Sequence, residues 1–288
     1  MPHSIRRLTE AEFPERLLEI PQPPKQLFLQ GTLPPIGNKL LCVVGARKYT
    51  PYGKEICEML ISGLRGLPVT IVSGLALGID GIAHRSALSA GLHTLAVPGS
   101  GIDRKVLYPA SHRNLAEEIL NKGGGLLSEF DLDFHATQYS FPQRNRIMAG
   151  LSHAVLIIEA EKKSGTLITA RLATDYNRDV LTIPGSIFSP TSTGPHLLLR
   201  IGATPITSVD ELKEALGFEI KESPEQKQIK FENCTLEEKE ILTIIQNGMA
   251  RDEIISSIKK PIQEINALLS LMEIKELTIE REGLLYPL

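Results

Sequence analysis

The residues best suited to ligand chemistry lie in one short stretch, SFPQRNRIMAGLS (140–152). It places an aromatic ring, Phe141, close to the guanidinium groups of Arg144 and Arg146. Arginine presents a planar fork of donors that matches phosphate oxygens, and an exposed ring offers a face on which an unpaired base can stack. The stretch therefore predicts a site for an anion that carries a flat ring.

The two arginines also have an internal interpretation. Arg144 and Arg146 could pair with carboxylates of the fold, such as Glu129 and Glu159, which follow predicted strands. An ion pair inside the protein would leave no guanidinium for a ligand. Which arginine faces a ligand, and which is tied to a carboxylate, stays open at the level of sequence.

Glycine and small polar residues gather where five predicted strands end. Glycine lets a backbone approach a ligand closely, and the helix after each strand points its free N–H groups at the same place. The carboxyl ends of parallel strands meet at one edge of a sheet, so these loops together predict a site for phosphates. The loops are GARKYT (45–50), SGLALGID (73–80), PGSGID (98–103), SGTLITA (164–170) and PGSIFSP (184–190).

Motifs for cofactor use and for catalysis are missing from the sequence. GLALG (74–78) has the wrong spacing for the dinucleotide fingerprint, and no Walker lysine motif, nucleophile elbow or H-E-x-x-H helix occurs. The three cysteines lack metal-ligand spacing. We therefore expect no cofactor, no metal and no catalytic residue. Asp80 at a predicted helix N-terminus is typical of helix stabilisation, and His84 and His112 are typical of packing.

Short apolar runs alternate with amphipathic stretches as far as residue 218. Each apolar run is continuous, as expected for strands covered on both faces. We therefore expect an α/β fold, an extended Rossmann-like, doubly wound and mostly parallel sheet, over residues 1–218, with 1–38 as a lead-in. The predicted strands are 40–46, 69–74, 94–99, 125–130, 154–160, 179–185 and a short last one at 203–206.

The C-terminal part predicts a second, smaller domain. A polar, charged segment at 219–232 predicts a linker, and residues 233–288 predict three short helices and a hairpin, the winged-helix pattern. Thr235 and Glu238 have the spacing of a capping box at the first helix. The third helix, PIQEINALLSLMEI, is apolar and acidic, which favours a docking or oligomerisation module over a DNA reader.

Composition indicates the cellular compartment and the part of the chain that would bind nucleic acid. The chain has 288 residues, three cysteines and a net charge of −3, and it shows no membrane-length apolar run and no signal-peptide core. We therefore expect a cytoplasmic protein without membrane contact. Residues 1–218 carry 22 Lys+Arg and 20 Asp+Glu, whereas residues 219–288 carry 9 and 14. Nucleic acid is therefore expected on the N-terminal part, at a local basic patch.

Seven sequence blocks occur in the order of a known family. They are GARKYT, SGLALGIDGIAHRSAL, YPASHRNLAEEI, LLSEF, FPQRNRIMAGLS, EAEKKSGTLITARLA and IPGSIFSPTSTGPHLLLRIGA. Over residues 12–210 the chain resembles the DNA-processing protein A family (DprA, also called Smf). Its C-terminal part resembles the winged-helix appendage that many members carry.

The resemblance implies a function. Members are cytoplasmic proteins that bind single-stranded DNA, protect it during natural transformation, load RecA recombinase onto it and form homodimers, and no enzymatic activity is generally assigned to them. Two departures stand out. Ala110 occupies a position where members often carry a basic residue, and almost no room precedes FPERLLEI for the small helical domain with which many members begin. Functions of that domain are therefore not expected.

The residues and the resemblance together predict one nucleic-acid-binding site. By the resemblance, Arg47 and the loop around 74–78 form a phosphate cradle, and the FPQRNR block forms its rim. The predicted site residues are Gly45, Arg47, Lys48, Ser73, Gly74, Ala76, Gly78, Asp80, Ser100, Gly101, Phe141, Arg144, Asn145, Arg146, Ser164, Gly165, Thr166 and Thr169.

An enzyme of related fold is the alternative. Nucleotide phosphoribohydrolases have a Rossmann-like sheet with a phosphate site near a Gly-Thr turn, and SGTLITA is faintly similar to that turn. Their P-G-G-x-G-T-x-x-E block is absent, however, and Ile168 falls where its glutamate would be. The sequence therefore favours a binding protein over an enzyme.

Overall fold

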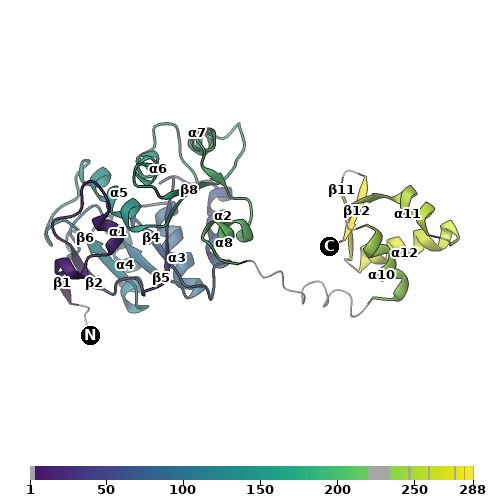
Figure 1. The fold of residues 1–288 in the computed structure, drawn as a ribbon, viewed down its shortest axis with the longest axis horizontal. Helices are drawn as coiled ribbons and strands as arrows, with labels where there is room; N and C mark the ends of the chain where they lie inside the picture. Colours follow the sequence, from purple (N-terminus) through teal and green to yellow (C-terminus); the bar gives the residue numbers. More distant parts are fainter. Residues whose placement is uncertain are drawn as a thin grey trace. The chain divides into compact units, whose positions relative to one another are not determined.

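The computed structural model describes residues 4–219, 234–245, 248–258, 260–275, 277–281 and 283–287. Contacts divide the chain into two compact units, residues 1–220 and residues 221–288 (Figure 1). The predicted linker, apart from Glu219, lies outside the described residues. Each unit is described by itself.

The first unit is built on one nine-stranded sheet in the order β1-β2-β6-β5-β4-β3-β7-β8-β9. All neighbours from β6 to β9 pair in parallel, whereas the pairs β1–β2 and β2–β6 are antiparallel. The predicted α/β class with a mostly parallel sheet is confirmed. The strands are β1 (Ile5–Arg7), β2 (Phe28–Gly31), β3 (Lys39–Val44), β4 (Val69–Ser73), β5 (His93–Ala96), β6 (Gly125–Ser128), β7 (Ala154–Ile157), β8 (Asp179–Thr182) and β9 (Thr204–Pro205).

Helices cover both faces of this sheet, which explains why its central strands are continuously apolar. In β3, Leu41 and Val43 belong to one buried cluster, whereas Cys42 and Val44 belong to the cluster on the opposite face. Successive side chains of a strand point to opposite faces, so both faces of β3 need apolar residues.

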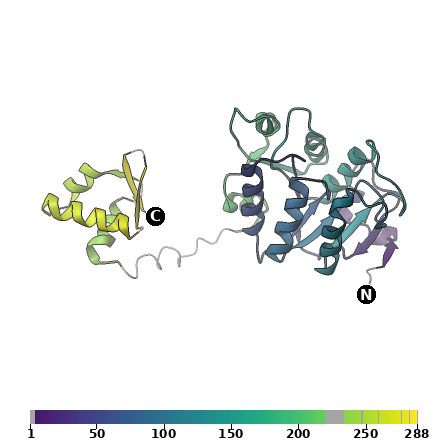
Figure 2. The same cartoon turned by 180° about the vertical axis from the view of Figure 1, so that it is seen from behind.

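The helices divide between the two faces. Figure 2 shows the blue helices α2, α3 and α4 side by side in front of the sheet, while α5 and α6 pack together on the other face (Figure 1). The α-helices of this unit are α1 (Glu15–Leu18), α2 (Pro51–Ser62), α3 (Ile79–Ala90), α4 (Arg113–Asn121), α5 (Ser140–Leu151), α6 (Thr166–Asp175), α7 (Thr193–Arg200) and α8 (Val209–Ala215). Three short 3-10 turns are η1 (Glu10–Glu12), η2 (Ala110–His112) and η3 (Pro190–Ser192).

The strand order reverses between β3 and β7. The chain builds from β3 outward through β4 and β5 to β6, then returns through α5 to place β7 on the other side of β3. At such a switch point the loops after the two strands diverge to opposite faces and leave a crevice at the carboxyl edge. The fold thus fixes one place where a ligand pocket is expected.

Two parts of this unit differ from the sequence-based expectation. The lead-in 1–38 contributes β1 and β2, which extend the sheet beyond β6. These strands have 3 and 4 residues and lie at the edge, so they carry no continuous apolar signal. Helix α7 was not predicted either, because Gly194 and Pro195 in its first turn hide the helical pattern.

The described residues of the second unit form three helices and a small sheet. They are α10 (Leu236–Ile244), α11 (Arg251–Ser257), α12 (Ile262–Ile274) and the strands β10 (Met249–Ala250), β11 (Thr278–Arg281) and β12 (Leu284–Pro287) in the order β10-β12-β11. The predicted capping box is present, because Thr235 and Glu238 exchange hydrogen bonds of 2.8 and 3.2 Å. The short strand β10 was not predicted. The winged-helix assignment stays a prediction.

Within the described ranges, no helix combines the length and the apolar character needed to cross a membrane.

Candidate nucleic-acid interface

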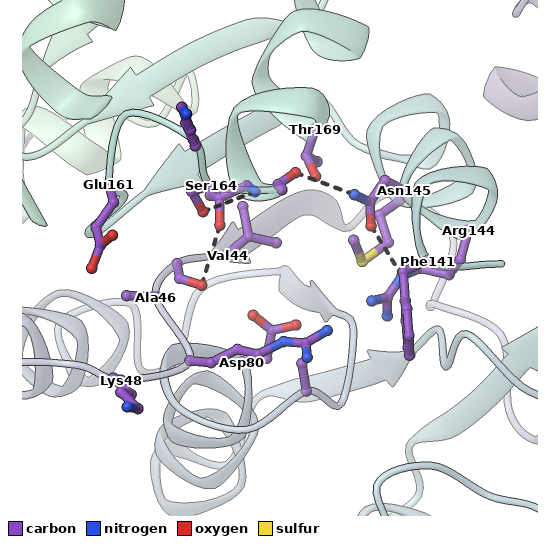
Figure 3. A pocket seen from close by; sticks show the side chains of 17 residues that line it. Val44, Ala46, Lys48, Asp80, Phe141, Arg144, Asn145, Glu161, Ser164 and Thr169 are labelled. Atoms are coloured by element: carbon purple, nitrogen blue, oxygen red, sulfur yellow. Dashed lines mark hydrogen bonds between the residues drawn. The ribbon is translucent and has the colours of Figure 1, made fainter. Parts of the chain in front are cut away.

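A pocket of about 460 Å³ opens at the switch point (Figure 3). We call it the switch-point pocket. The loops after β3, β4 and β7 and the helices α5 and α6 surround it. Its lining residues are Val44, Gly45, Ala46, Arg47, Lys48, Ala76, Asp80, Phe141, Arg144, Asn145, Met148, Glu161, Lys163, Ser164, Gly165, Thr166 and Thr169.

The loop after β3 supplies an exposed cation against a ring. The Arg47 guanidinium carbon lies 5.2 Å from the centre of the Phe141 ring, a cation–π distance. The ring is half-buried, with the Tyr108 ring centre 5.5 Å away and Gly99 directly beneath it, where a side chain would collide with Phe141. Lys48 adds a second exposed cation. This side of the pocket therefore combines positive charge with an aromatic face.

The opposite wall is the N-terminus of α6. The Thr166 N–H donates to Ser164 Oγ (3.2 Å), and the Thr166 hydroxyl donates to the Gly45 carbonyl (3.2 Å), which joins this wall to the loop after β3. The positive end of the helix dipole favours an anion at such a terminus. Gly165 is exposed and no other atom crowds it, and Lys163 lines the pocket beside it. This wall has the properties of a phosphate site.

The floor of the pocket holds a buried carboxylate, Asp80, and a buried guanidinium, Arg144. Asp80 and Arg144 are each only 5% exposed, and they bracket Gly74: the Gly74 N–H donates to Asp80 (3.0 Å), and Arg144 Nη1 donates to the Gly74 carbonyl (2.5 Å). Arg144 also donates to the Val97 carbonyl and to Asn145 Oδ1. A side chain at Gly74 would collide with both charged groups. The pair therefore fixes the loop after β4.

The two charges of this pair oppose the effect of burial on each other. Burial raises the pKa of Asp80, and the Arg144 guanidinium and the Gly74 N–H counteract that rise. Burial likewise lowers the pKa of Arg144, and Asp80 counteracts this. The charges of Asp80 and Arg144 therefore balance, and the net positive charge of the pocket comes from Arg47, Lys48 and Lys163, which outnumber Glu161.

Arg146 lies outside the switch-point pocket. It forms an ion pair with Glu129, whose side chain is 8% exposed, and it donates to the Gln22 carbonyl (2.8 Å). Burial raises the pKa of Glu129, and the Arg146 guanidinium opposes the rise. The question left open by the sequence thus has a structural answer: Arg144 lines the pocket, and Arg146 is tied to a carboxylate.

The remaining predicted site residues support the loops rather than line the pocket. Ser73 donates from its hydroxyl to the Val43 carbonyl (2.6 Å), and Gly78, with φ +81°, lets the start of α3 pass against the loop after β3. Ser100 and Gly101 are buried under the loop after β6, where Gly101 lies against the Asp131 carbonyl. The other predicted residues, apart from Gly74 and Arg146, line the pocket itself.

Glu159, expected from the sequence to pair with an arginine, instead occupies a helix terminus. Its carboxylate is 3% exposed and accepts from the Thr50 N–H (3.0 Å), the Thr50 hydroxyl (2.5 Å) and the Thr191 hydroxyl (2.9 Å). Thr50 is the N-cap of α2. In dinucleotide-binding Rossmann folds, the terminus of the helix after the first strand binds pyrophosphate. Here a carboxylate of the same chain occupies it.

Pocket residues contributed by the loop after β7 also escaped prediction. Glu161 and Lys163 line the switch-point pocket, and both follow directly on a predicted strand end. The signal that could have identified them was their charge at the same edge of the sheet as Arg47. Over the described residues, no group of three or more histidine, cysteine, aspartate or glutamate side chains is arranged to hold a metal ion.

The fold and the pocket define the class of this protein: an α/β, Rossmann-like protein with an anion-type pocket at the switch point and no dinucleotide fingerprint. The chain belongs to the family described as DNA recombination-mediator protein A, whose model matches residues 4–217. The resemblance predicted from the sequence blocks is thereby confirmed.

Relatives support the same family. Protein Smf of Escherichia coli K12 is 41% identical over 219 residues, which are 76% of this chain and 58% of that protein. DNA processing protein DprA of Streptococcus pneumoniae is 41% identical over 206 residues, 72% of each chain. The chain spans only 58% and 52% of the length of the Smf proteins of E. coli and Synechocystis.

Solved structures show the same fold. DNA processing protein A from Streptococcus pneumoniae superposes with a TM-score of 0.68 at 36% identity, covering 75% of each chain. DNA processing protein A from Helicobacter pylori superposes with a TM-score of 0.66 at 30% identity, covering 75% of this chain and 98% of that one.

Proposed function

We propose that this protein binds single-stranded DNA in the switch-point pocket. One observation carries the proposal: an exposed guanidinium, Arg47, stacks over the Phe141 ring opposite the N-terminus of α6. A phosphate at the helix terminus and at Arg47 would leave its base beside the ring. Sequence-tolerant single-strand sites combine these two features, a positive groove and stacking aromatics.

Family membership supports single-stranded DNA as the ligand. The structure of the Helicobacter pylori relative addresses its single-stranded DNA binding mode, and the relatives are DNA processing proteins by name. We extend the proposal to the roles that the family implies: protection of incoming DNA in natural transformation and loading of RecA recombinase onto it, by a cytoplasmic homodimer.

The proposal includes no catalytic step. Asp80 is the buried carboxylate of the pocket, and it accepts a hydrogen bond from the Gly74 N–H beside Arg144. A carboxylate engaged in this way holds the loop after β4. The position where a phosphoribohydrolase glutamate would stand is Ile168, so no observation favours that enzyme.

The test is a binding titration with single-stranded and duplex oligonucleotides at two salt concentrations. We expect the single strand to bind more tightly. Arg47→Ala should weaken single-strand binding and lower the salt slope by about 0.7, the contribution of one phosphate contact. Arg171→Ala is the matched control, because Arg171 lies on α6 outside the pocket with its side chain 85% exposed. Equal affinity and slope for Arg47→Ala and wild type would overturn the proposal.

A further inference from the structure

The loop between β8 and η3 presents two apolar side chains to solvent. Ile187 is 78% exposed and Phe188 is 90% exposed. Among the described residues, Phe188 makes no ring–ring contact, and its backbone N–H is held by the Ser186 hydroxyl (3.2 Å). Burying a phenylalanine ring is favourable, so these two adjacent exposed side chains form a candidate contact surface.

Hydrogen bonds attach both ends of this loop to the rest of the first unit. At its start, the Tyr52 hydroxyl donates to the Pro184 carbonyl (2.8 Å). At its end, Thr191 donates to Glu159, which also accepts from Thr50 at the start of α2. The anchored stems present Phe188 at a defined place rather than on a free loop.

That place is on the same edge as the switch-point pocket. The loop follows β8, which is separated from β3 only by β7, so the two strand ends are about 10 Å apart. Lys48 and Glu161 lie at the end of the pocket opposite Phe141 (Figure 3). A bound strand would leave the pocket at this end, past Lys48 and Glu161.

The surface between the pocket and Phe188 suits a nucleic-acid backbone. The loop after β3 continues from Lys48 into Tyr49, which is 45% exposed, and then Tyr52, which is 47% exposed. The loop after β7 contributes the exposed Lys162 and Lys163, with one carboxylate, Glu161, beside them. Cations alternate here with aromatic faces, as they do in single-strand binding grooves.

We infer that the single strand held in the switch-point pocket continues across the loop after β7 and stacks a base on Phe188. The inference rests on the proposed function, and it adds the Phe188 ring to the DNA-binding site. The continuity of cations from the pocket to the ring favours a nucleic-acid occupant over a second copy or another protein.

A length series of oligo-deoxythymidines, from about 4 to about 16 nucleotides, tests this inference. Strands that fill only the pocket should bind wild type and Phe188→Ala equally. Longer strands should bind Phe188→Ala more weakly, by about 5- to 150-fold, which is the value of one base–aromatic stack. Phe188→Tyr keeps the ring and should behave as wild type at every length.

A direct readout exists because the chain contains no tryptophan. Phe188→Trp would introduce a single indole, whose fluorescence should be quenched by the longer strands and unchanged by the shortest ones. This variant reports stacking even if the affinity of Phe188→Ala changes little.

The outcomes separate this inference from the proposed function. If wild type binds no single strand at any length, the proposed function fails. If wild type binds but Phe188→Ala matches it at every length and the Phe188→Trp fluorescence does not respond, the inference alone is overturned. It is also overturned if Phe188→Ala lowers the oligomeric mass of the free protein, because the ring then belongs to a contact between copies.

Discussion

At the scale of single residues, the decisive feature is the different environment of two arginines on α5. Arg144 and Arg146 are two positions apart, and such positions point to nearly opposite sides of a helix. A helix prediction alone therefore implies that they cannot share one ligand. Which one faces the pocket depends on Glu129 and Gln22, which are distant in sequence and approach only in the fold. Sequence reasoning could pose this choice but not resolve it.

The ion pair of Arg146 leads to a prediction about stability. Arg146→Ala leaves Glu129 buried without its partner, so the free energy of unfolding should fall by about 3–5 kcal/mol. Single-strand affinity and its salt slope should stay close to wild type, because Arg146 does not line the pocket. Denaturant unfolding and the salt titration measure the two effects separately.

The control for this variant is Arg47→Ala, which should show the reverse pattern: stability near wild type with a reduced salt slope. The exposed Arg47 has no buried partner, whereas Arg146 has one. A reduced salt slope in a fully folded Arg146→Ala protein would contradict the assignment and return Arg146 to the DNA contact.

At the scale of elements, burial determined what could be predicted. Strands such as β3 and β7 are covered on both faces, so their apolar runs are continuous and were predicted. The short strands β1 and β2, at one end of the sheet, consist mostly of partly exposed residues, and nothing local distinguishes them from a loop. The glycine-rich strand ends were informative because the carboxyl ends of parallel strands meet at one edge of the sheet in any strand order.

The hydrogen bonds of Glu159 at the start of α2 lead to a prediction about stability. Glu159→Gln removes the charge that accepts from Thr50 and Thr191, so the free energy of unfolding should fall by about 1.5–3 kcal/mol, the contribution of a charged hydrogen bond. Thermal or denaturant unfolding measures the loss. Glu161→Gln, two residues along the same loop but exposed, should change stability by less than about 0.5 kcal/mol. If Glu159→Gln also changed stability by less than about 0.5 kcal/mol, the hydrogen bonds of Glu159 would add no stability.

At the scale of the whole molecule, the charge of the chain is divided between its two units. The switch-point pocket lies wholly within residues 1–220, and the second unit has its own apolar core around Ile241, Ile265 and Leu269. The sequence indicated both the division and the excess of acid in the second part. The binding partner of the second unit could not be predicted, because an acidic and apolar third helix could contact several kinds of protein surface.

Truncation tests whether DNA binding belongs to the first unit alone. A fragment of residues 1–220 should fold, because its three buried clusters contain no residue of the second unit. It should bind single strands with the affinity and salt slope of the full chain, since the removed segment, with 13 acidic and 9 basic residues (221–288), offers no net attraction to phosphate. Circular dichroism checks folding, and the oligonucleotide titration checks binding. A folded fragment with a smaller salt slope would mean that cations of the second unit reach the DNA. Unchanged binding together with lost transfer of the strand to a recombinase would assign the second unit to that transfer.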